Sequence, residues 1–409
     1  MARGGRPQAT LDVAIVGAGI IGLATALALL RNRPSLRLAI VEQETDIAAH
    51  QTGHNSGVLH AGLYYAPGSL KARLCTAGKA EMERYATEHA VPFQRVGKLV
   101  IAVEPHELTA LMALLDRATA NGVPGLELVG PERIRELEPH AVGAQGLWSP
   151  TTGIMDFRRV AQVMAEDVRQ RGGSIYVGRR VTGLRERADG VVLETSAGAL
   201  QAANTIVAAG LWSDRLAAMT GDAGAERIVP FRGDYYRLTE DARSLVNGLI
   251  YPVPDPRLPF LGIHFTRRID GEVWAGPNAV LAFARDGYSR TAFDLREIVG
   301  LLADPGFRRL AARYWRVGLA EVWRDWSRGA FLASLQRFIP ELRRDQLTFG
   351  PSGVRAQALD QNGSLVDDFR LGGRGRVIHV RNAPSPAATA SLAIGREVAG
   401  RAAAQFGLG

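Results

Sequence analysis

The pattern of apolar positions is clearest at the beginning of the chain. A short apolar run at residues 12–16 is followed by a glycine-rich segment at 17–22, a helix-like stretch at 23–31 and a second apolar run at 36–42. Short apolar runs bounded by glycine are typical of buried strands, so this order predicts a compact βαβ unit. The apolar residues from 11 to 30 would nearly span a bilayer, but the glycines among them favour a soluble strand, turn and helix.

Helical and strand-like patterns continue to alternate along the first half of the chain. This alternation favours a largely parallel sheet covered by helices. Helices are predicted at residues 69–89, 105–121, 156–171 and from 213 onward, and strands at 97–103, 174–177, 191–195 and 205–209.

The pattern changes in the second half. Between residues 230 and 278, strand-like runs are separated by proline and glycine, which predicts a mainly antiparallel sheet. An arginine-rich helical region follows at 294–344, and the chain closes with a strand at 377–380 and a helix up to residue 405. The strand-like runs of the antiparallel part lie at residues 235–238, 261–266 and 272–275.

Size and cysteine content narrow the class of protein. The chain has 409 residues, 46% of them hydrophobic, which predicts two closely connected domains rather than one simple core. Its single cysteine, Cys75, excludes an intramolecular disulfide framework, and no group of cysteines and histidines has zinc-binding spacing. Residues 1–10 are polar and show no secretory signal, so we expect a cytoplasmic protein without a metal.

The charge favours anionic partners. A formal net charge of +8 fits nucleic acid, an anionic membrane surface, an acidic substrate or a phosphate-rich cofactor. Nucleic acid is disfavoured because the arginines are dispersed and no basic motif is interleaved with aromatic residues.

The glycine-rich segment has the spacing of a dinucleotide-binding turn. Gly17, Gly19 and Gly22 would form the turn, admit a pyrophosphate and allow close helix packing, in that order. Glu42, at the end of the second strand, is placed to bind a ribose and to repel a 2′-phosphate. The turn, with Ile20 and Ile21 at the helix N-terminus, therefore predicts an adenosine diphosphate group, which FAD and NAD share.

Eight further segments decide between these cofactors by resemblance. They read HQTGHNSGVLHAGLYY at 50–65, PGSLKA at 67–72, GKL at 97–99, GIMDF at 153–157, FRGDYY at 231–236, FLGIHFT at 260–266, GPSGVRAQ at 350–357 and HVRNAPSPAAT at 379–389. Together they closely resemble the L-2-hydroxyglutarate dehydrogenases and oxidases, a branch of the FAD-dependent D-amino-acid oxidase superfamily. The resemblance covers essentially the whole chain apart from a short basic N-terminal extension.

The resemblance implies an α/β fold with FAD as the cofactor. A discontinuous Rossmann-type FAD-binding domain would comprise residues 1–90, 150–225 and 345–409, and an inserted substrate domain with an antiparallel sheet would comprise 91–149 and 226–344. The implied reaction is oxidation of L-2-hydroxyglutarate to 2-oxoglutarate by hydride transfer to flavin N5, with a quinone, oxygen or another electron acceptor. The alternatives are an amino acid or glycerol 3-phosphate as substrate, and an FAD-binding protein without catalysis.

Two histidines and one arginine are the candidate catalytic residues. Oxidation of a secondary alcohol needs a base for the hydroxyl proton, and His264 is favoured over His60, which lies in the stretch expected beside the flavin. Arg355 is expected in a turn that reaches the flavin, where its guanidinium would bind the C1 carboxylate. Histidines that only pack in the core or against the flavin are the alternative for the first two.

A larger set is assigned to binding. Tyr64, Tyr65, Lys71, Arg232 and Tyr236 are candidates for the distal carboxylate or the pocket wall, although each alone is more often a packing or surface residue. Additional flavin contacts are expected from two polar turns and the ends of nearby strands. These candidates are Thr52, His54, Asn55, Ser56, Gly57, Val181, Ala209, Gly210, Trp212, Gly353, Pro384, Ser385 and Ala387.

The helical region at 294–344 suggests a surface role. It combines arginines with Trp315, Trp323 and Trp326, a composition suited to peripheral attachment to an anionic membrane, where a quinone is within reach. A packed helical subdomain or an oligomer contact is the alternative.

Overall fold

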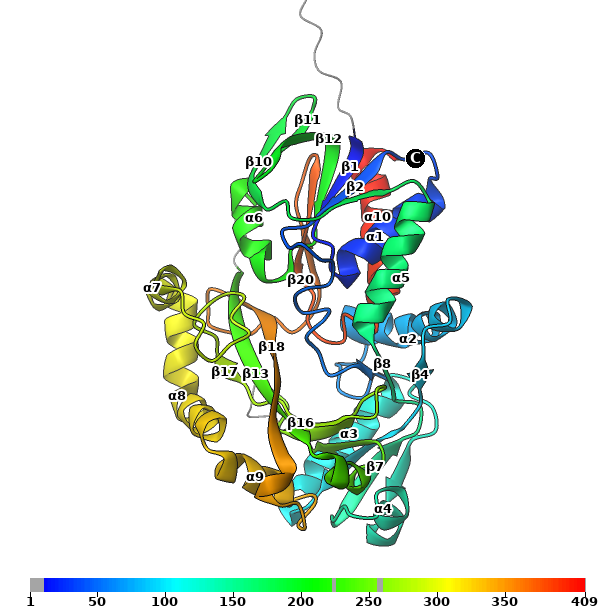
Figure 1. Ribbon diagram of the computed structural model, residues 1–409, viewed down its shortest axis with the longest axis vertical. Helices are drawn as coiled ribbons and strands as arrows, with labels where there is room; N and C mark the ends of the chain where they lie inside the picture. The colour runs from blue at the N-terminus through cyan, green and yellow to red at the C-terminus, as the bar shows by residue number, and fades with distance from the viewer. Residues whose placement is uncertain (1–10, 223–225, 256–259, 409) are drawn as a thin grey trace, which may run out of the picture.

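The computed structural model describes residues 11–222, 226–255 and 260–408. Two large sheets lie in separate lobes, one above the other in the view of Figure 1. Residues 1–10, for which the sequence predicts no secretory signal, lie outside the described part of the chain.

The first sheet contains the predicted βαβ unit and has a parallel centre. Strands β20, β12, β1, β2 and β9 are parallel neighbours, and β10, β11 and β19 extend the sheet with antiparallel pairs. The strand bounds are β1 Leu11–Val16, β2 Leu38–Val41, β9 Ser174–Tyr176, β10 Val181–Arg187, β11 Gly190–Thr195, β12 Gly198–Val207, β19 Arg370–Gly372 and β20 Val377–Asn382.

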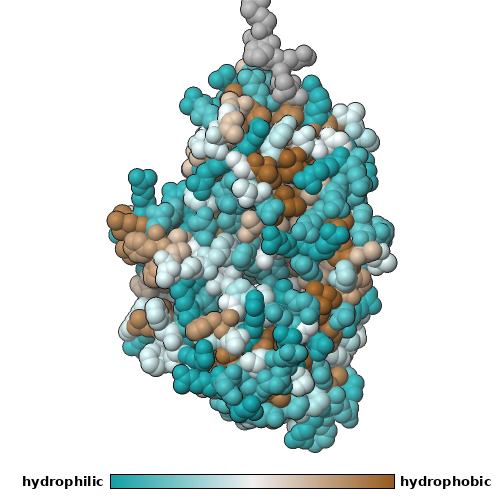
Figure 2. All heavy atoms as spheres, viewed as in Figure 1, coloured by the Kyte–Doolittle hydropathy of each residue, from teal (hydrophilic) through white to brown (hydrophobic). Residues whose placement is uncertain are grey.

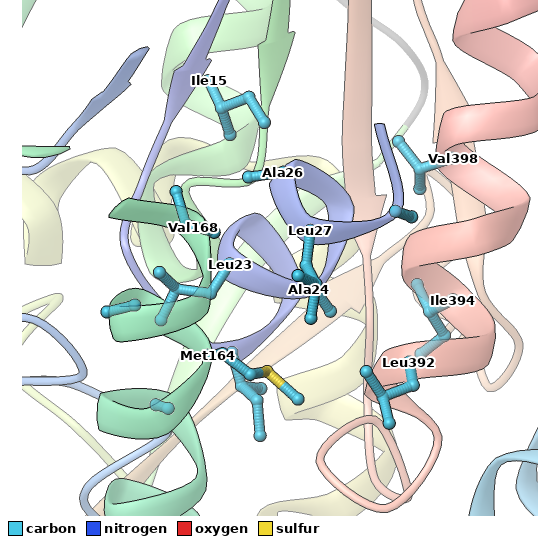
Figure 3. Close-up of a cluster of buried hydrophobic side chains, with 14 of the residues drawn as sticks. Ile15, Leu23, Ala24, Ala26, Leu27, Met164, Val168, Leu392, Ile394 and Val398 are labelled. Atoms are coloured by element: carbon cyan, nitrogen blue, oxygen red, sulfur yellow. The ribbon is translucent and has the colours of Figure 1, made fainter. Parts of the chain in front are cut away.

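Three helices form a layer against this sheet: α1 (Ile20–Asn32), α5 (Phe157–Gln170) and α10 (Ser391–Phe406). A Cβ atom on Gly395 of α10 would lie 2.6 Å from the Ala24 carbonyl oxygen of α1, so glycine permits the close crossing of these helices. The helices share one apolar cluster that also covers β1 (Figure 3). Its labelled members are Ile15, Leu23, Ala24, Ala26, Leu27, Met164, Val168, Leu392, Ile394 and Val398.

The second sheet is antiparallel except where β14 and β5 run parallel. Its order is β17-β13-β16-β15-β14-β5-β7-β6, with β18 also paired to β13. The bounds are β5 Lys98–Ala102, β6 Glu127–Val129, β7 Gln145–Ser149, β13 Arg227–Leu238, β14 Leu249–Pro252, β15 His264–Arg267, β16 Val273–Gly276, β17 Val280–Leu281 and β18 Leu347–Leu359.

The remaining elements cover the second sheet or join the lobes. A small sheet of β3, β8 and β4 lies between them, and α2 contacts α10 of the first lobe. Their bounds are β3 Val58–Leu59, β4 Phe93–Gln94, β8 Gly153–Met155, α2 Leu70–Glu88, α3 Leu108–Ala120, α4 Pro131–Leu137, α6 Ser213–Met219, α7 Leu295–Ala303, α8 Pro305–Trp326 and α9 Arg328–Gln336. Short 3₁₀ helices occupy Pro105–Glu107, Gly210–Trp212, Glu240–Leu245 and Arg344–Gln346.

Most predicted elements are confirmed, and one important segment differs. Residues 350–357, expected as a turn that reaches the flavin, belong to the long strand β18, which pairs with β13 from Arg227 to Leu238. Pairing therefore places residues 347–359 in the second sheet. The resemblance implies that residues 345–409 belong to the FAD-binding domain, and these domain bounds stay a prediction. The first sheet resumes only with β19.

Candidate active site

The turn between β1 and α1 has two crowded glycines and one open glycine. Gly17 has φ +105°, and a Cβ there would lie 2.5 Å from the Ala208 carbonyl oxygen. A Cβ on Gly22 would lie 2.0 Å from the Gly17 carbonyl oxygen. On Gly19, in contrast, a Cβ would meet only the Thr52 Oγ1 atom, at 3.4 Å. The space in front of Gly19 therefore suits a phosphate group held by the N-terminus of α1.

Two side chains hold this turn in place. Glu42, directly after β2, accepts a hydrogen bond from the Ala18 N–H at 2.7 Å and one from the Glu44 N–H at 3.0 Å. Thr52 Oγ1 accepts a hydrogen bond from the Ile20 N–H at 3.0 Å. Glu42 thus braces the turn through the backbone, and its contact with a ribose stays a prediction.

The loop after Thr52 connects the turn to the second sheet. His54 Nδ1 donates to the Ser352 carbonyl at 3.1 Å, and burial lowers the pKa of His54. Gln51 Oε1 accepts from the Ala356 N–H at 3.1 Å, and the Asn55 carbonyl accepts from Arg268 at 3.1 Å. The loop is therefore fastened to β18 and lies between the two lobes.

The other predicted flavin contacts fall into two places. Gly210 follows β12 and has φ +50°, and the nearby indole N–H of Trp212 is buried without a partner in the described part of the chain. Arg180, the neighbour of Val181, lies 5.0 Å from the centre of the Trp212 ring. Gly353 lies against the backbone of His54. The predicted contacts grouped near the dinucleotide turn are Gly17, Gly19, Ile20, Ile21, Gly22, Glu42, Thr52, Ala209 and Gly210.

Strand alternation gives the second sheet two faces, each with its own apolar cluster. One of them also carries Lys98, Tyr251 and His264, and we call it the polar face. Leu99, Ile250, Phe265 and Ala275 are cross-strand partners in one row and belong to the same apolar cluster. Successive side chains of a strand point to opposite faces. The residues next to this row therefore point to the other face, which packs against α3 and against the segment at residues 58–64.

The polar face carries His264, the favoured base. Its Nδ1 lies 2.9 Å from the Gly262 carbonyl oxygen, which can only accept, so Nδ1 holds the proton and Nε2 has a free lone pair. The imidazole stacks on Tyr251, with ring centres 3.8 Å apart. Burial, with smaller effects from Lys98 and Arg355, lowers the pKa of His264 to about 3, so the ring is neutral.

His60 meets the same site from the first lobe. It follows β3, and its N–H donates to Thr389 Oγ1 at 3.1 Å. Its Nε2 lies 3.5 Å from Ser385 Oγ, in the predicted C-terminal turn. Burial lowers the pKa of His60 well below its ordinary value, and Lys98 and His264 act in the same direction. The two histidines therefore share one buried environment.

Arg355 reaches the polar face from β18. It is paired with Phe231, and its guanidinium lies 5.5 Å from the centre of the Phe260 ring. One N–H donates to the Asn278 carbonyl at 3.3 Å, and burial lowers the pKa of Arg355. Within the described residues, no carboxylate pairs with it at salt-bridge distance. Arg355 is therefore a half-buried cation with donors available for an anion, although it lies on a strand and not in the expected turn.

The predicted pocket residues divide between the site and the core. Tyr64 has a buried hydroxyl without a partner, and Tyr65 is hydrogen-bonded to Ser385. Lys71 donates to Asp367 at 2.8 Å, so its charge is already paired. These three residues lie on the loop and helix that follow His60.

The side chains of Arg232 and Tyr236 lie on the face of β13 that is opposite to the polar face. Arg232 forms ion pairs with Asp234 at 2.9 Å and with Asp325 of α8 at 3.0 Å. The Tyr236 ring packs 4.6 Å from Phe331 in the core. The structure therefore does not bring these two side chains to His264, because their strand positions alternate with those of the polar face.

Sequence reasoning missed three residues that the structure places on the polar face: Lys98, Tyr251 and Tyr235. Lys98 Nζ lies 3.9 Å from the centre of the Tyr251 ring. Tyr235 is buried beside Trp274 and within electrostatic range of Arg355. The sequence did contain one signal for Lys98, which opens an otherwise apolar strand. Because lysine is rarely buried, a lysine at the start of a buried strand indicates a functional position.

The turn and the polar face together define a two-lobed oxidoreductase that binds an adenosine diphosphate cofactor. Residues 12–401 match the family model for FAD dependent oxidoreductases, and the chain belongs to this family. The predicted fold class and the predicted FAD cofactor are thereby confirmed, and the open space at Gly19 fits the cofactor's pyrophosphate.

Curated relatives share nearly the full length. The chain is 47% identical to the mitochondrial L-2-hydroxyglutarate dehydrogenase of Nematostella vectensis over 98% of this chain and 92% of the relative. It is 44% identical to the mitochondrial enzyme of the same name from Homo sapiens over 98% and 90%, respectively. The predicted membership of this enzyme group is therefore confirmed, as is the prediction of an FAD-dependent oxidoreductase that acts on a CH–OH group.

Solved structures agree with the fold. The L-alpha-glycerophosphate oxidase of Mycoplasma pneumoniae, solved with FAD bound, superimposes with a TM-score of 0.78 at 22% identity, covering 95% of this chain and 93% of that one. The glycine oxidase of Geobacillus kaustophilus superimposes with a TM-score of 0.71 at 20% identity, covering 95% and 93%. At these identities the likeness supports the fold alone.

Proposed function

We propose that this enzyme oxidises L-2-hydroxyglutarate to 2-oxoglutarate with FAD as the immediate electron acceptor. The names of its full-length relatives support this substrate. The observation that carries the proposal is His264, a neutral buried base within electrostatic range of the unpaired cation of Arg355. A 2-hydroxy acid needs both groups, a base for its hydroxyl and a cation for its C1 carboxylate.

His264 would act through Nε2. With Nδ1–H held by the Gly262 carbonyl, Nε2 is the ring atom that can accept the hydroxyl proton as the alcohol becomes a ketone. Bound FAD supplies the acceptor for the hydride, at its N5 position. Stacking on Tyr251 fixes the orientation of the imidazole, and burial keeps water away from the proton that it receives.

Arg355 would position the substrate. A guanidinium can hold a carboxylate with two parallel N–H donors, which fixes both the distance and the rotation of the carbon that bears the hydroxyl. Because Arg355 projects from β18, the long pairing of this strand with β13 gives the clamp a rigid base.

Anaerobic mixing of the purified yellow enzyme with L-2-hydroxyglutarate tests the substrate. We expect the flavin absorbance to bleach, with glycerol 3-phosphate and an L-amino acid as comparison substrates. His264→Ala should retain FAD and reduce the rate of bleaching roughly 10²-fold or more, the usual scale for a lost general base. Bleaching by a comparison substrate and not by the hydroxy acid would overturn the substrate assignment. Loss of FAD from the variant would instead assign His264 to cofactor binding.

We also infer a membrane-docking surface, which would place the enzyme near a quinone acceptor. Large apolar side chains are exposed just before α7 and along α7 and α8, including Phe293 at 65%, Trp323 at 67% and Trp326 at 74%. Figure 2 shows hydrophobic atoms gathered at the left edge of the molecule, over α7 and the adjoining part of α8. The other exposed members are Leu295, Val299, Leu302, Trp315, Leu319 and Val322, and the exposed arginines beside them are Arg308, Arg309, Arg313 and Arg316.

This composition suits the interface of an anionic bilayer. Tryptophan favours the headgroup region, and arginine is attracted to anionic lipid. Among the helices that the structure describes, each is too short or too polar to cross a membrane, so attachment would be peripheral. Co-sedimentation with vesicles of anionic and of neutral lipid tests this proposal.

We expect binding to anionic vesicles at low salt that weakens as salt is raised. Replacing Trp323 and Trp326 together by alanine should abolish it, whereas Met112→Ala, at an exposed apolar position on α3, should not. Absence of binding at low salt would leave the surface as an oligomer contact, which sedimentation velocity would then report as a salt-insensitive dimer or larger assembly.

A further inference from the structure

Lys98 is a buried cation on the polar face of the second sheet. It opens β5, and only 1% of the residue is exposed. Its ammonium lies 3.9 Å from the centre of the Tyr251 ring and 5.1 Å from that of Tyr64. Because His264 stacks on the same Tyr251 ring, the lysine and the candidate base belong to one site.

The charge of Lys98 lacks an anionic partner. Within the part of the chain that the structure describes, no aspartate or glutamate pairs with it, whereas Lys71 pairs with Asp367 at 2.8 Å and Lys79 with Glu83 at 2.6 Å. An unpaired buried charge destabilises the folded protein, and two aromatic faces compensate for only part of that cost. Such a group is expected where a ligand supplies the missing charge.

The position of Lys98 complements that of Arg355. In the sheet order β18-β13-β16-β15-β14-β5, His264 lies on β15, with Arg355 on one side and Lys98 on the other. Both cations act on the electrostatic environment of His264. A molecule that places its reacting carbon at His264 and a carboxylate at each end therefore meets a cation in both directions.

We propose that Lys98 binds the distal carboxylate of the substrate and so selects dicarboxylic 2-hydroxy acids over monocarboxylic ones. The proposal rests on the function proposed above and specifies which residue recognises the far end of the substrate. Tyr64, whose buried hydroxyl has no partner, lies beside the ammonium and can donate a second hydrogen bond to the same carboxylate.

The acid–base behaviour of Lys98 agrees with this geometry. Burial lowers its pKa to about 7, so the free enzyme holds it poised between the neutral and charged forms. An arriving carboxylate favours the charged form and gains a charge-assisted hydrogen bond in surroundings from which water is excluded.

The test compares two substrates of equal chain length in wild-type enzyme and Lys98→Met. L-2-hydroxyglutarate carries the distal carboxylate, and L-2-hydroxyvalerate has a methyl group in its place. We expect the variant to lose kcat/KM for the dicarboxylate by about 10²-fold or more, chiefly through KM, and to change little with the monocarboxylate. Lys98→Arg should restore part of the discrimination.

Two controls separate a binding role from a structural one. Lys79→Met removes another largely buried lysine, but one that is paired with Glu83, and should leave the substrate preference unchanged. The melting temperature of Lys98→Met should equal or exceed that of the wild type, because an unpaired charge is removed. A lower melting temperature, or an equal loss of activity on both substrates, would overturn the proposal.

A binding measurement keeps the test independent of the reaction. Glutarate, which cannot be oxidised at C2, should perturb the flavin absorbance of the wild type and bind about 10²-fold more weakly to Lys98→Met. If the wild type binds glutarate in this way but does not oxidise L-2-hydroxyglutarate, the proposed function fails while the role of Lys98 stands. If the wild type oxidises the dicarboxylate and both proteins bind glutarate equally, the role of Lys98 is refuted.

Discussion

Replacing Gly19 by valine should prevent FAD binding without unfolding the protein. Gly19 has φ −74° and ψ 172°, a conformation open to any residue, and a Cβ there would meet only Thr52 Oγ1, at 3.4 Å. The folded chain therefore tolerates the side chain, but the side chain would occupy the space that a pyrophosphate needs at the N-terminus of α1.

The loss of FAD binding determines how much the Gly19→Val variant is destabilised relative to the wild type. At a free cofactor concentration of 1,000 Kd, binding stabilises a protein by about 4 kcal/mol, and this increment should vanish in the variant. At roughly 2 °C per kcal/mol for a large domain, the melting temperature measured with added FAD should fall by about 8 °C. Without FAD, the wild type and the Gly19→Val variant should melt at nearly the same temperature.

Gly22→Ala is the matched comparison within the same turn. Its Cβ would lie 2.0 Å from the Gly17 carbonyl oxygen, so the backbone of the turn must shift. We expect this variant to lower the melting temperature even without FAD, by an amount that corresponds to about 3 kcal/mol or more. The absorbance at the flavin band and thermal melts with and without FAD distinguish the two cases. A yellow Gly19→Val protein with stoichiometric FAD would refute the assignment of the open space to the pyrophosphate.

Two further predictions concern charge. Arg355→Lys should raise KM for the hydroxy acid and lower kcat, because an ammonium cannot reproduce a two-donor clamp; unchanged steady-state kinetics would remove Arg355 from the site. His379 is fully buried, and burial lowers its pKa to about 4. Between pH 6.5 and 4 the folded state therefore binds fewer protons than the unfolded state. His379 thus adds about 3 kcal/mol to the free energy of unfolding above pH 6.5, and this contribution is lost as the pH falls toward 4. Urea unfolding at several pH values should show this loss in the wild type and a flatter dependence in His379→Gln; equal slopes would contradict the assignment.

Regular periodicity made the first lobe predictable. The apolar run at residues 12–16 and the helix at 156–171 contain neither proline nor glycine, and the helix at 69–89 contains only Gly78. These three predictions match β1, α5 and α2. Strand β18 was missed because it contains Gly350, Pro351 and Gly353, which are typical of a turn. The register with β13 shifts between Asp234 and Tyr236, opposite this segment, and such a bulge accommodates a proline in a sheet.

The site was only partly predicted from the motifs. Lys98 and Tyr235 were missed although they lie in the segments at 97–99 and 231–236, because a motif does not show which of its side chains faces the site. The glycine turn was predicted from its spacing, and His60, His264 and Arg355 lie in segments that the family resemblance identifies. Arg232 and Tyr236 lie in such a segment as well, but they share its strand with Tyr235, and only the sheet assigns one side chain to the site and the next to the core. Lys98 became visible only when burial and the lack of a partner could be read from the fold.

The second sheet combines a stabilising apolar core with unpaired charges that destabilise the folded protein. Leu99, Ile250 and Phe265 pack in the core beneath the sheet, while Lys98, Tyr251 and His264, their immediate neighbours along the same strands, form the polar face. The apolar face contributes burial energy of about 25 cal/mol per Å² of apolar surface removed from water. That energy is spread over many residues, so it can offset the cost of two unpaired cations, the buried Lys98 and the half-buried Arg355. The cations also favour substrate binding. A dicarboxylate that pairs with both of them removes the free-energy cost of the unpaired charges, which the folded enzyme already bears.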